Sequence, residues 1–324
     1  MKRVEEWKIA VVGAGTMGLG IAQLFATHGF EVSLYNRTAA NLEKGMMQIR
    51  SNLQTMAELN EIQEIQIPEI LSHIHKGSDL AEAVRDADYI VENVAEDESV
   101  KMKIFADIDA GCKEDAILAS NTSTMNIFRF LKVHNMKRLA ITHYFLPAYV
   151  IPLVELVRGP ETSDETVEQL KALMACAGKE TAVLNSAIPG FIVNRITLAI
   201  FREAAYIASM GYATPEDIDK AVCSVYGPRF TFGGPFGLCD FAGVDIYERL
   251  SDLLFPEISN ATSCPQMVRD MLAAGNRGVK SGKGFYEYKD SAAASQWNAH
   301  ITRMLQAIRQ TNALFETKNR VSHF

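Results

Sequence analysis

Gly13-Ala14-Gly15-Thr16-Met17-Gly18 follows the apolar run Lys8-Ile9-Ala10-Val11-Val12 and precedes a helical pattern over residues 19–28. A strand, a glycine-rich turn and a helix in this order are typical of a dinucleotide-binding unit. Gly13 permits the sharp turn, Gly15 lets a pyrophosphate approach the backbone, and Gly18 lets the helix pack closely on the sheet. The N–H groups at the start of the helix, near Thr16 and Met17, then face the phosphates.

Strands and helices continue to alternate after this turn, which predicts an α/β fold with a Rossmann-type, doubly wound parallel sheet. After Ser186 the pattern becomes helical, and Thr214-Pro215 is a typical helix start. We therefore predict a dinucleotide-binding domain over residues 1–186 and an all-helical domain for substrate binding and dimerisation over residues 187–324. The expected strands cover residues 31–35, 87–91, 116–120 and 139–143, and the expected helices cover residues 39–61, 101–108 and 191–210.

Composition narrows the class of protein. The 324 residues are 48% apolar and 22% charged with a net charge of −7, so we expect no general affinity for nucleic acid or for an anionic membrane. Residues 9–26 carry no charge, but their regular glycines argue against a signal peptide or a membrane span. The five cysteines include no CxxC pair, so we expect no disulfide framework, no metal site and a cytoplasmic location.

The residues after the second strand, Asn36-Arg37-Thr38, bear on the choice of cofactor. NAD-binding chains usually place an acidic residue there to accept a hydrogen bond from the ribose 2′-OH. Neutral Asn36 removes the repulsion of a 2′-phosphate, which Arg37 and Thr38 could bind, so NADP is permitted. Alternatively, Asn36 contacts the ribose of NAD while Arg37 points to solvent. Residues 36–38 are therefore compatible with either NAD or NADP as the cofactor.

His143 and Glu155 are the candidate proton-transfer residues. His143 ends a strand, where such sheets bind ligands, and Glu155 falls within the apolar run Pro152-Leu153-Val154-Glu155-Leu156-Val157. A carboxylate in a buried strand needs a partner, and a histidine so oriented is suited to act as a general base. The alternative is an edge-strand glutamate beside an unrelated surface histidine.

Two further polar groups lie at similar positions. Ser120-Asn121-Thr122-Ser123 follows a strand, and Asn194 lies just inside the apolar helix that Pro189 opens. Hydroxyl-rich turns are often helix N-caps, but near a nicotinamide such a hydroxyl could hold the substrate oxygen. Asn194 either caps the chain locally or reaches into the cleft.

These residues together resemble the 3-hydroxyacyl-CoA dehydrogenase family. The resemblance extends from about residue 9 to residue 288 and consists of motifs in family order, which are individually weak and jointly specific. The motifs are Gly13-Ala14-Gly15-Thr16-Met17-Gly18-Leu19-Gly20-Ile21-Ala22, Val91-Glu92 with Glu96 and Lys101, Ser120-Asn121-Thr122-Ser123, His143-Tyr144-Phe145, Leu153-Val154-Glu155, Pro189-Gly190-Phe191-Ile192-Val193-Asn194-Arg195 and Gly282-Lys283-Gly284-Phe285-Tyr286.

The resemblance implies an NAD(P)-dependent oxidoreductase of fatty acid metabolism that forms a homodimer through its helical domain. It implies that His143 is the general base, that Glu155 orients it, and that Ser123 and Asn194 hold the hydroxyl or keto oxygen. Glu96, Lys101 and Asn121 would lie near the cofactor. The implied substrate is a 3-hydroxyacyl-CoA, whose 3-hydroxyl carbon exchanges a hydride with the nicotinamide.

Two departures keep a different substrate open. The family's usual asparagine after the His-Phe-Phe motif is Leu146 here. The segment over residues 39–64, where relatives carry basic residues beside the CoA nucleotide, holds two cations (Lys44, Arg50) against four carboxylates (Glu43, Glu58, Glu61, Glu64). A small 3-hydroxy acid or related alcohol without CoA is therefore the alternative substrate. A catalytically silent nucleotide-binding module is a third interpretation. The presence of a complete set of candidate proton-transfer residues favours an enzyme, because a silent module does not need them.

Replacing Asn36 by aspartate should shift cofactor preference toward NAD, because the new carboxylate accepts from a ribose hydroxyl and repels a 2′-phosphate. The ratio of kcat/KM for NAD to that for NADP, measured for both proteins, should rise by about tenfold or more, the equivalent of about 1.4 kcal/mol. An unchanged ratio would show that residue 36 does not contact the ribose.

Overall fold

The computed structural model describes residues 3–231, 233–288 and 293–316. The chain forms two compact units, residues 1–194 and residues 195–324, which are described separately. The predicted domain boundary after residue 186 falls slightly before this division and stays a prediction.

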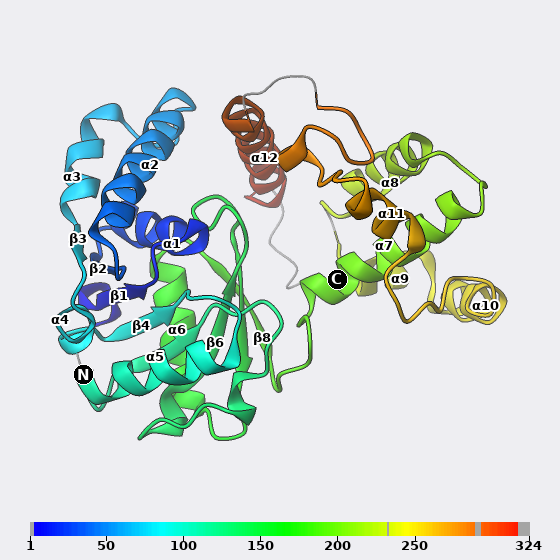
Figure 1. The fold of residues 1–324 in the computed structure, drawn as a ribbon. Coiled ribbons are helices and arrows are strands. Elements are labelled where there is room, and N and C mark those ends of the chain that lie inside the picture. Colours follow the sequence, from blue (N-terminus) through cyan, green and yellow to red (C-terminus); the bar gives the residue numbers. More distant parts are fainter. Residues whose placement is uncertain (1–2, 232, 289–292, 317–324) are drawn as a thin grey trace. The chain divides into compact units, whose positions relative to one another are not determined.

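The first unit is built on one eight-stranded sheet with the order β3-β2-β1-β4-β5-β6-β7-β8 (Figure 1). Neighbouring strands from β3 to β6 are parallel, as predicted, and the order reverses beside β1 as it does in a doubly wound sheet. The strands are β1 (Lys8–Val12), β2 (Glu31–Tyr35), β3 (Ile74–Gly77), β4 (Tyr89–Glu92), β5 (Ile117–Ser120), β6 (Leu139–Tyr144), β7 (Leu153–Arg158) and β8 (Glu180–Leu184).

The sheet departs from the predicted parallel arrangement at one end. β7 pairs with β6 antiparallel, and β8 is parallel to β7. Only residues 145–152 connect β6 to β7, and a parallel crossover needs about a dozen residues or more, so the chain must turn back. The edge strands β3 and β8 were not predicted.

Helices cover both faces of this sheet (Figure 1). Alternate residues of β1 separate two hydrophobic clusters: Ile9 and Val11 belong to one, and Ala10 and Val12 to the other. Residues of α1, α2, α3 and α6 enter the first cluster, and residues of α4 and α5 enter the second. The helices are α1 (Thr16–Thr27), α2 (Ala39–Glu58), α3 (Ile67–Ser72), α4 (Leu80–Arg85), α5 (Glu98–Gly111) and α6 (Asp164–Cys176), with 3-10 turns η1 (Val4–Glu6), η2 (Glu64–Gln66), η3 (Ile127–Arg129) and η4 (Met136–Arg138).

The second unit is helical, as predicted, and the described part of the chain from residue 195 onward has only isolated β-bridges. The Thr214 hydroxyl accepts a hydrogen bond from the Asp217 N–H and caps the following helix, whose first residue is Pro215. Its elements are α7 (Val193–Ser209), which starts in the first unit, α8 (Pro215–Arg229), α9 (Pro235–Ala242), α10 (Val244–Leu254), α11 (Gln266–Ala273), η5 (Val279–Ser281) and α12 (Ala293–Glu316). Within the described ranges, no helix has the length and hydropathy needed to span a bilayer.

Candidate active site

The glycine turn between β1 and α1 has little room on one side and open space on the other. Gly13 has φ +109°, and a Cβ there would lie 2.8 Å from the Asn93 carbonyl oxygen. A Cβ on Gly18 would lie 1.8 Å from the Gly13 carbonyl oxygen, whereas one on Gly15 would meet no atom within 4 Å. Gly15 is the N-cap of α1, which starts at Thr16 and not at residue 19 as expected. The open space beside the first N–H groups of the helix fits the pyrophosphate of a dinucleotide.

Asn36 follows β2 and stabilises its own turn. Its Oδ1 accepts a hydrogen bond from the Thr38 N–H at 3.0 Å, and the side chains of Arg37 and Thr38 are exposed. This contact leaves the Asn36 amide NH₂ to donate to a ligand. The geometry is therefore compatible with a neutral hydrogen-bond donor beside a ribose.

A buried ion pair lies where β4 and β5 end. Lys101 Nζ of α5 donates to both carboxylate oxygens of Glu92 at 2.8 and 2.9 Å, and both side chains are at most 1% exposed. The Ser120 hydroxyl donates to Glu92 Oε2 at 2.6 Å. Our residue-based prediction missed Glu92. It has the same signature as Glu155, a carboxylate at the end of an otherwise apolar strand.

Glu96 connects this ion pair to the Ser120–Ser123 turn. It accepts hydrogen bonds from the Thr122 hydroxyl and from the Ser123 N–H, the latter at 3.1 Å, and lies 3.2 Å from Lys101 Nζ. Burial acts to raise the pKa of Glu96, but the Thr122 hydrogen bond and the Lys101 charge outweigh it, so the pKa is lowered. Glu96 is therefore an anion at neutral pH with fixed orientation.

Asn121 follows β5 and forms hydrogen bonds with residues at the carboxyl ends of β4 and β6. Its Nδ2 donates to Asn93 Oδ1 at 2.9 Å, and its Oδ1 accepts from the Tyr144 N–H at 2.8 Å. The predicted cofactor residues Glu96 and Asn121, which follow β4 and β5, therefore lie on one edge of the sheet, the edge where doubly wound sheets bind ligands.

His143 and Glu155 are direct partners across β6 and β7. His143 Nδ1 lies 2.7 Å from Glu155 Oε2, and the residues are 4% and 0% exposed. The expected pairing is therefore present, and it depends on the antiparallel turn that the residues did not predict. The rings of Phe145 and Phe191 pack on the imidazole, with centroid distances of 4.5 and 5.4 Å.

Glu155 is satisfied on both oxygens. Its Oε1 accepts hydrogen bonds from the Ile192 and Val193 N–H groups, both at 2.9 Å. Burial acts to raise the pKa of Glu155, but the hydrogen bonds from His143, Val193 and Ile192 outweigh it and lower the pKa. The ionised carboxylate therefore stabilises the fold at neutral pH, and this contribution is lost as the pH falls through the folded-state pKa.

Ser123 and Asn194 lie beside each other. Asn194 Nδ2 donates to the Ser123 carbonyl oxygen at 3.4 Å, and Asn194 directly follows Val193, whose N–H binds Glu155. The Ser123 side chain is exposed. The structure thus brings the four predicted catalytic residues to the same carboxyl edge of the sheet.

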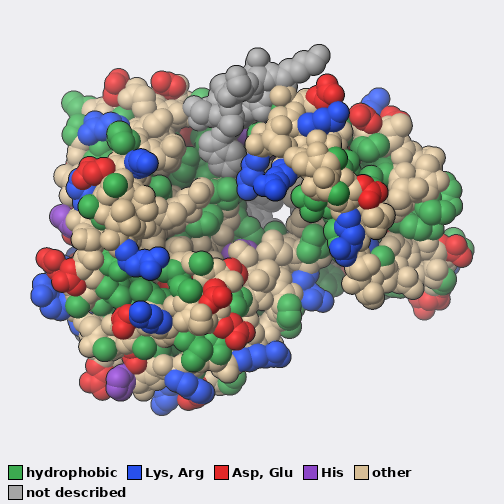
Figure 2. Space-filling view, viewed as in Figure 1, with side chains coloured by type: hydrophobic (Ala, Val, Ile, Leu, Met, Phe, Trp, Pro, Cys, Tyr) green, Lys and Arg blue, Asp and Glu red, His purple; other side chains and the backbone are tan. Residues whose placement is uncertain are grey.

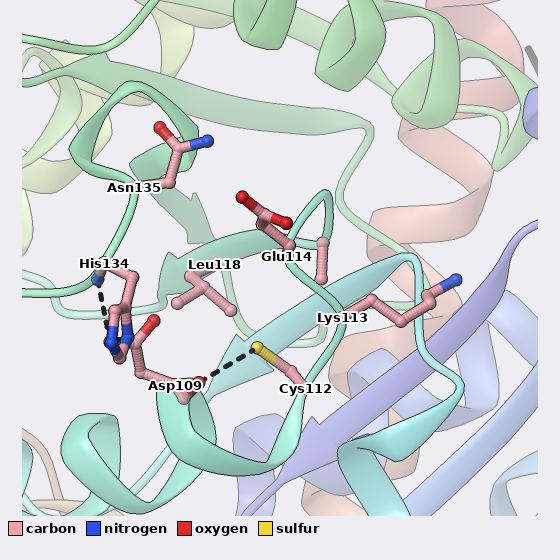
Figure 3. Close-up of a pocket in the computed structure, with 8 residues that line it drawn as sticks. Asp109, Cys112, Lys113, Glu114, Leu118, His134 and Asn135 are labelled. Atoms are coloured by element: carbon pink, nitrogen blue, oxygen red, sulfur yellow. Dashed lines mark hydrogen bonds and ion pairs between the residues drawn. The ribbon is translucent and has the colours of Figure 1, made fainter.

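A cavity of about 250 Å³ at the opposite edge of the sheet, where α5 ends and β5 begins, has different chemistry (Figure 3). His134 Nδ1 lies 2.7 Å from Asp109 Oδ2. Burial raises the pKa of the nearby Cys112 thiol, which disfavours the nucleophilic thiolate. Among the described residues no three His, Cys, Asp or Glu side chains are grouped to hold a metal ion.

Two family models match the chain. Residues 8–187 match the model of the 3-hydroxyacyl-CoA dehydrogenase NAD-binding domain, and residues 190–288 match that of the 3-hydroxyacyl-CoA dehydrogenase C-terminal domain.

Similar proteins include enzymes with and without CoA in their names. A 5-formyl-3-hydroxy-2-methylpyridine 4-carboxylate 5-dehydrogenase of Mesorhizobium japonicum is 32% identical, covering 93% of this chain and 97% of its own. A probable 3-hydroxybutyryl-CoA dehydrogenase of Bacillus subtilis is 35% identical over 88% of this chain and 99% of its own.

Solved structures are also similar to this chain. A crystal structure of the pyridine carboxylate dehydrogenase, described as an NAD+ dependent dismutase, has a TM-score of 0.85 at 29% identity, covering 95% of this chain and 99% of that one. Mycobacterium tuberculosis FadB2 has a TM-score of 0.73 at 32% identity, covering 87% of this chain and 99% of that one.

The glycine turn allows packing and ligand binding to be separated by mutation. Gly18→Ala should destabilise the protein by about 1–3 kcal/mol or more, because its Cβ would overlap the Gly13 carbonyl. Gly15→Ala should leave the melting temperature within a few degrees of wild type but weaken NAD binding at least about tenfold, since its methyl group would occupy the space for the pyrophosphate. Thermal unfolding and NADH fluorescence titration measure the two effects. If Gly15→Ala binds NAD with wild-type affinity, the pyrophosphate does not bind beside Gly15.

Proposed function

This chain belongs to the 3-hydroxyacyl-CoA dehydrogenase family of NAD-binding oxidoreductases, and from that premise we propose that His143 and Glu155 perform its proton transfer. The observation that carries the proposal is the buried contact between His143 Nδ1 and Glu155 Oε2. With Glu155 ionised, Nδ1 carries the proton and donates a hydrogen bond to the carboxylate. Nε2 then has the free lone pair and accepts the proton of a substrate hydroxyl.

The remaining polar residues have roles in orientation. NAD, when bound, supplies the hydride acceptor. Ser123 and Asn194 hold the substrate oxygen within reach of His143 Nε2, and their proximity to each other supports this assignment. Glu96, Lys101 and Asn121 form the polar edge that positions the cofactor. The protein therefore contributes orientation and charge placement, while the redox chemistry belongs to the cofactor.

We propose NAD as the cofactor, with NADP as the second candidate. The NAD-binding family domain and the NAD+ dependent relative support NAD. The Asn36 amide NH₂ can donate to a ribose oxygen while its Oδ1 holds the Thr38 N–H. Exposed Arg37 keeps NADP as the second candidate.

For the substrate we propose a small hydroxy or carbonyl compound without CoA. The cations Lys44 and Arg50 are exposed on α2, but Glu43 and Glu58 lie on the same helix and a further cation, Lys76, is paired with Glu43. Such a surface attracts the CoA phosphates weakly. The match to the pyridine carboxylate enzyme over 95% of this chain also supports a free acid or aldehyde.

A 3-hydroxyacyl-CoA is the second candidate, which would place the protein in fatty acid metabolism. Its support is the family match over both domains and the Bacillus subtilis relative. Both candidates use the same proton transfer, because Nε2 accepts the proton of an alcohol or of a hydrated aldehyde, and reduction of a carbonyl is the reverse step. They differ in what holds the rest of the substrate.

We further propose that the protein is a cytoplasmic homodimer that assembles through its second unit. Within the described part of that unit, α10 and the residue after it expose large apolar side chains, and Figure 2 shows hydrophobic side chains at this surface. Contiguous apolar surface of this kind is typical of subunit interfaces. The five free cysteines are compatible with a reducing compartment. The exposed apolar residues are Val244, Ile246, Tyr247, Leu250, Leu253, Leu254 and Phe255.

A substrate panel tests the proposed reaction. Acetoacetyl-CoA, acetoacetate and 5-formyl-3-hydroxy-2-methylpyridine-4-carboxylate should be assayed with NADH and NADPH, and with NAD+ for the aldehyde. We expect the highest kcat/KM with a substrate that lacks CoA. His143→Ala should lower kcat by about 10²–10⁴-fold, the usual contribution of a general base.

The outcomes of the panel separate the candidates. Turnover of acetoacetyl-CoA alone would show that the substrate is an acyl-CoA and not a small compound without CoA. Full activity in His143→Ala would refute the proposed base, and inactivity with every substrate despite NADH binding would favour a silent nucleotide-binding module.

Light scattering during size-exclusion chromatography tests the dimer. The wild type should have twice the 35.8 kDa mass of one chain, and Leu253→Arg together with Ile246→Arg should have the mass of one chain. Met47→Arg, at an apolar residue 63% exposed on α2 in the first unit, is the matched control and should stay dimeric. Dimers of unchanged stability in the double variant would place the interface elsewhere.

A further inference from the structure

The chain adopts an unusual backbone conformation just before α7. Gly190 has φ +79°, and Phe191 has φ +51°. A bulky side chain in the left-handed region costs roughly 1–3 kcal/mol and persists only where surrounding contacts enforce it. Such residues are concentrated at functional sites.

This turn directs two backbone donors at one carboxylate oxygen. After Phe191, the N–H groups of Ile192 and Val193 both lie 2.9 Å from Glu155 Oε1. Val193 is the first residue of α7, so the positive end of the helix dipole also faces the carboxylate. Because His143 occupies Oε2, the turn and the imidazole together satisfy both oxygens of Glu155.

The Phe191 side chain contacts the other member of the pair. It is 0% exposed, and its ring centroid lies 5.4 Å from that of His143 at an interplanar angle of 61°. An edge-to-face contact of this kind restricts the tilt of the imidazole and keeps water from that side. One residue thus packs on the base while its backbone directs the following N–H groups toward the carboxylate.

We propose that the turn over residues 190–193 is a positioning element for proton transfer, with the Phe191 ring orienting His143 and the N–H groups of Ile192 and Val193 keeping Glu155 ionised. The proposal rests on the proposed role of His143 and Glu155. Phe191 and Val193 act through these two residues and have no contact with substrate in the mechanism.

The surroundings of Glu155 determine the expected pH effect. His143 faces it from β6, uncharged Ala182 is its partner on β8, and only backbone N–H groups reach it from the turn. These hydrogen bonds lower the pKa of Glu155 against the effect of burial. Removing one donor therefore raises this pKa and lets the carboxylate protonate at a higher pH.

Val193→Pro removes one of these donors with little other change, because proline is tolerated at the first position of a helix and has no N–H. We expect the acid limb of the kcat–pH profile to move up by roughly one unit. We also expect KM for NAD to remain unchanged. The matched control is Asp164→Pro, at the first position of α6, which should keep the wild-type profile.

Phe191→Gly tests the ring. Glycine adopts the left-handed conformation without strain, so the variant keeps the turn and deletes the side chain. We expect kcat to fall about tenfold or more with little change in KM for NAD, as for a 1 Å misplacement of a catalytic group. Phe191→Tyr, which retains the ring, should recover most of the lost activity. Asn60→Gly relaxes another left-handed residue, φ +58°, outside the site and should leave kcat unchanged.

His143→Ala is run in parallel to separate this proposal from the proposed function. If His143→Ala is inactive while Val193→Pro and Phe191→Gly keep the wild-type kcat and pH profile, the positioning role is wrong and the proposed base stands. If His143→Ala remains active, the proposed function itself fails. Circular dichroism checks folding, and where Val193→Pro does not fold, the comparison of Phe191→Gly with Phe191→Tyr decides.

Discussion

A buried carboxylate must be satisfied on both oxygens, and this requirement organises the edge of the sheet that carries the proposed active site. Glu155 is fully buried in β7, where an unpaired anion would cost several kcal/mol. Its two oxygens are satisfied from different segments, by His143 on β6 and by the chain entering α7. The antiparallel return of β7 is what makes this possible, since it places Glu155 opposite His143 in the pairing register. The pairing of His143 with Glu155 thus follows from the topology of the sheet.

Glu92 repeats this solution at the end of β4. Lys101 neutralises the carboxylate, Ser120 donates to it, and Glu96 brings the Ser123 backbone to the same lysine. Breaking such a buried pair by removing one partner costs about 3–5 kcal/mol, so the residues around it are held firmly. Two satisfied carboxylates therefore give the edge a fixed arrangement before any ligand arrives, as efficient orientation of reactants requires.

Local patterns predicted much of this arrangement, and the parts they missed depend on distant partners. The glycine turn, the strands of the sheet centre and the helical second unit have strong periodic or turn signals, so they were recognised. The edge strand β3 is short and carries His75 and Lys76 among few apolar residues, so only its pairing with β2 identifies it. Glu92 was quoted in a family motif but was assigned no role, because its partner, Lys101, comes from a helix whose packing the sequence does not specify. Asn36 was weighed only for its effect on the cofactor, as a ribose ligand or as a neutral residue beside a 2′-phosphate, although its Oδ1 also stabilises the local turn.

The proposed separation between the proton-transfer pair and the choice of substrate also has a physical basis in this chain. The proposed proton-transfer pair lies on β6 and β7. Its orienting contacts come from these strands, from Phe145 directly after β6 and from the turn before α7. Leu146 is 46% exposed and the charges of α2 are on the surface, where substitutions usually change stability little. In the proposed mechanism, substitution at such positions alters which molecule is held, while His143 Nε2 still takes the proton. Similar proteins named for an acyl-CoA and for a pyridine carboxylate are what this separation leads one to expect.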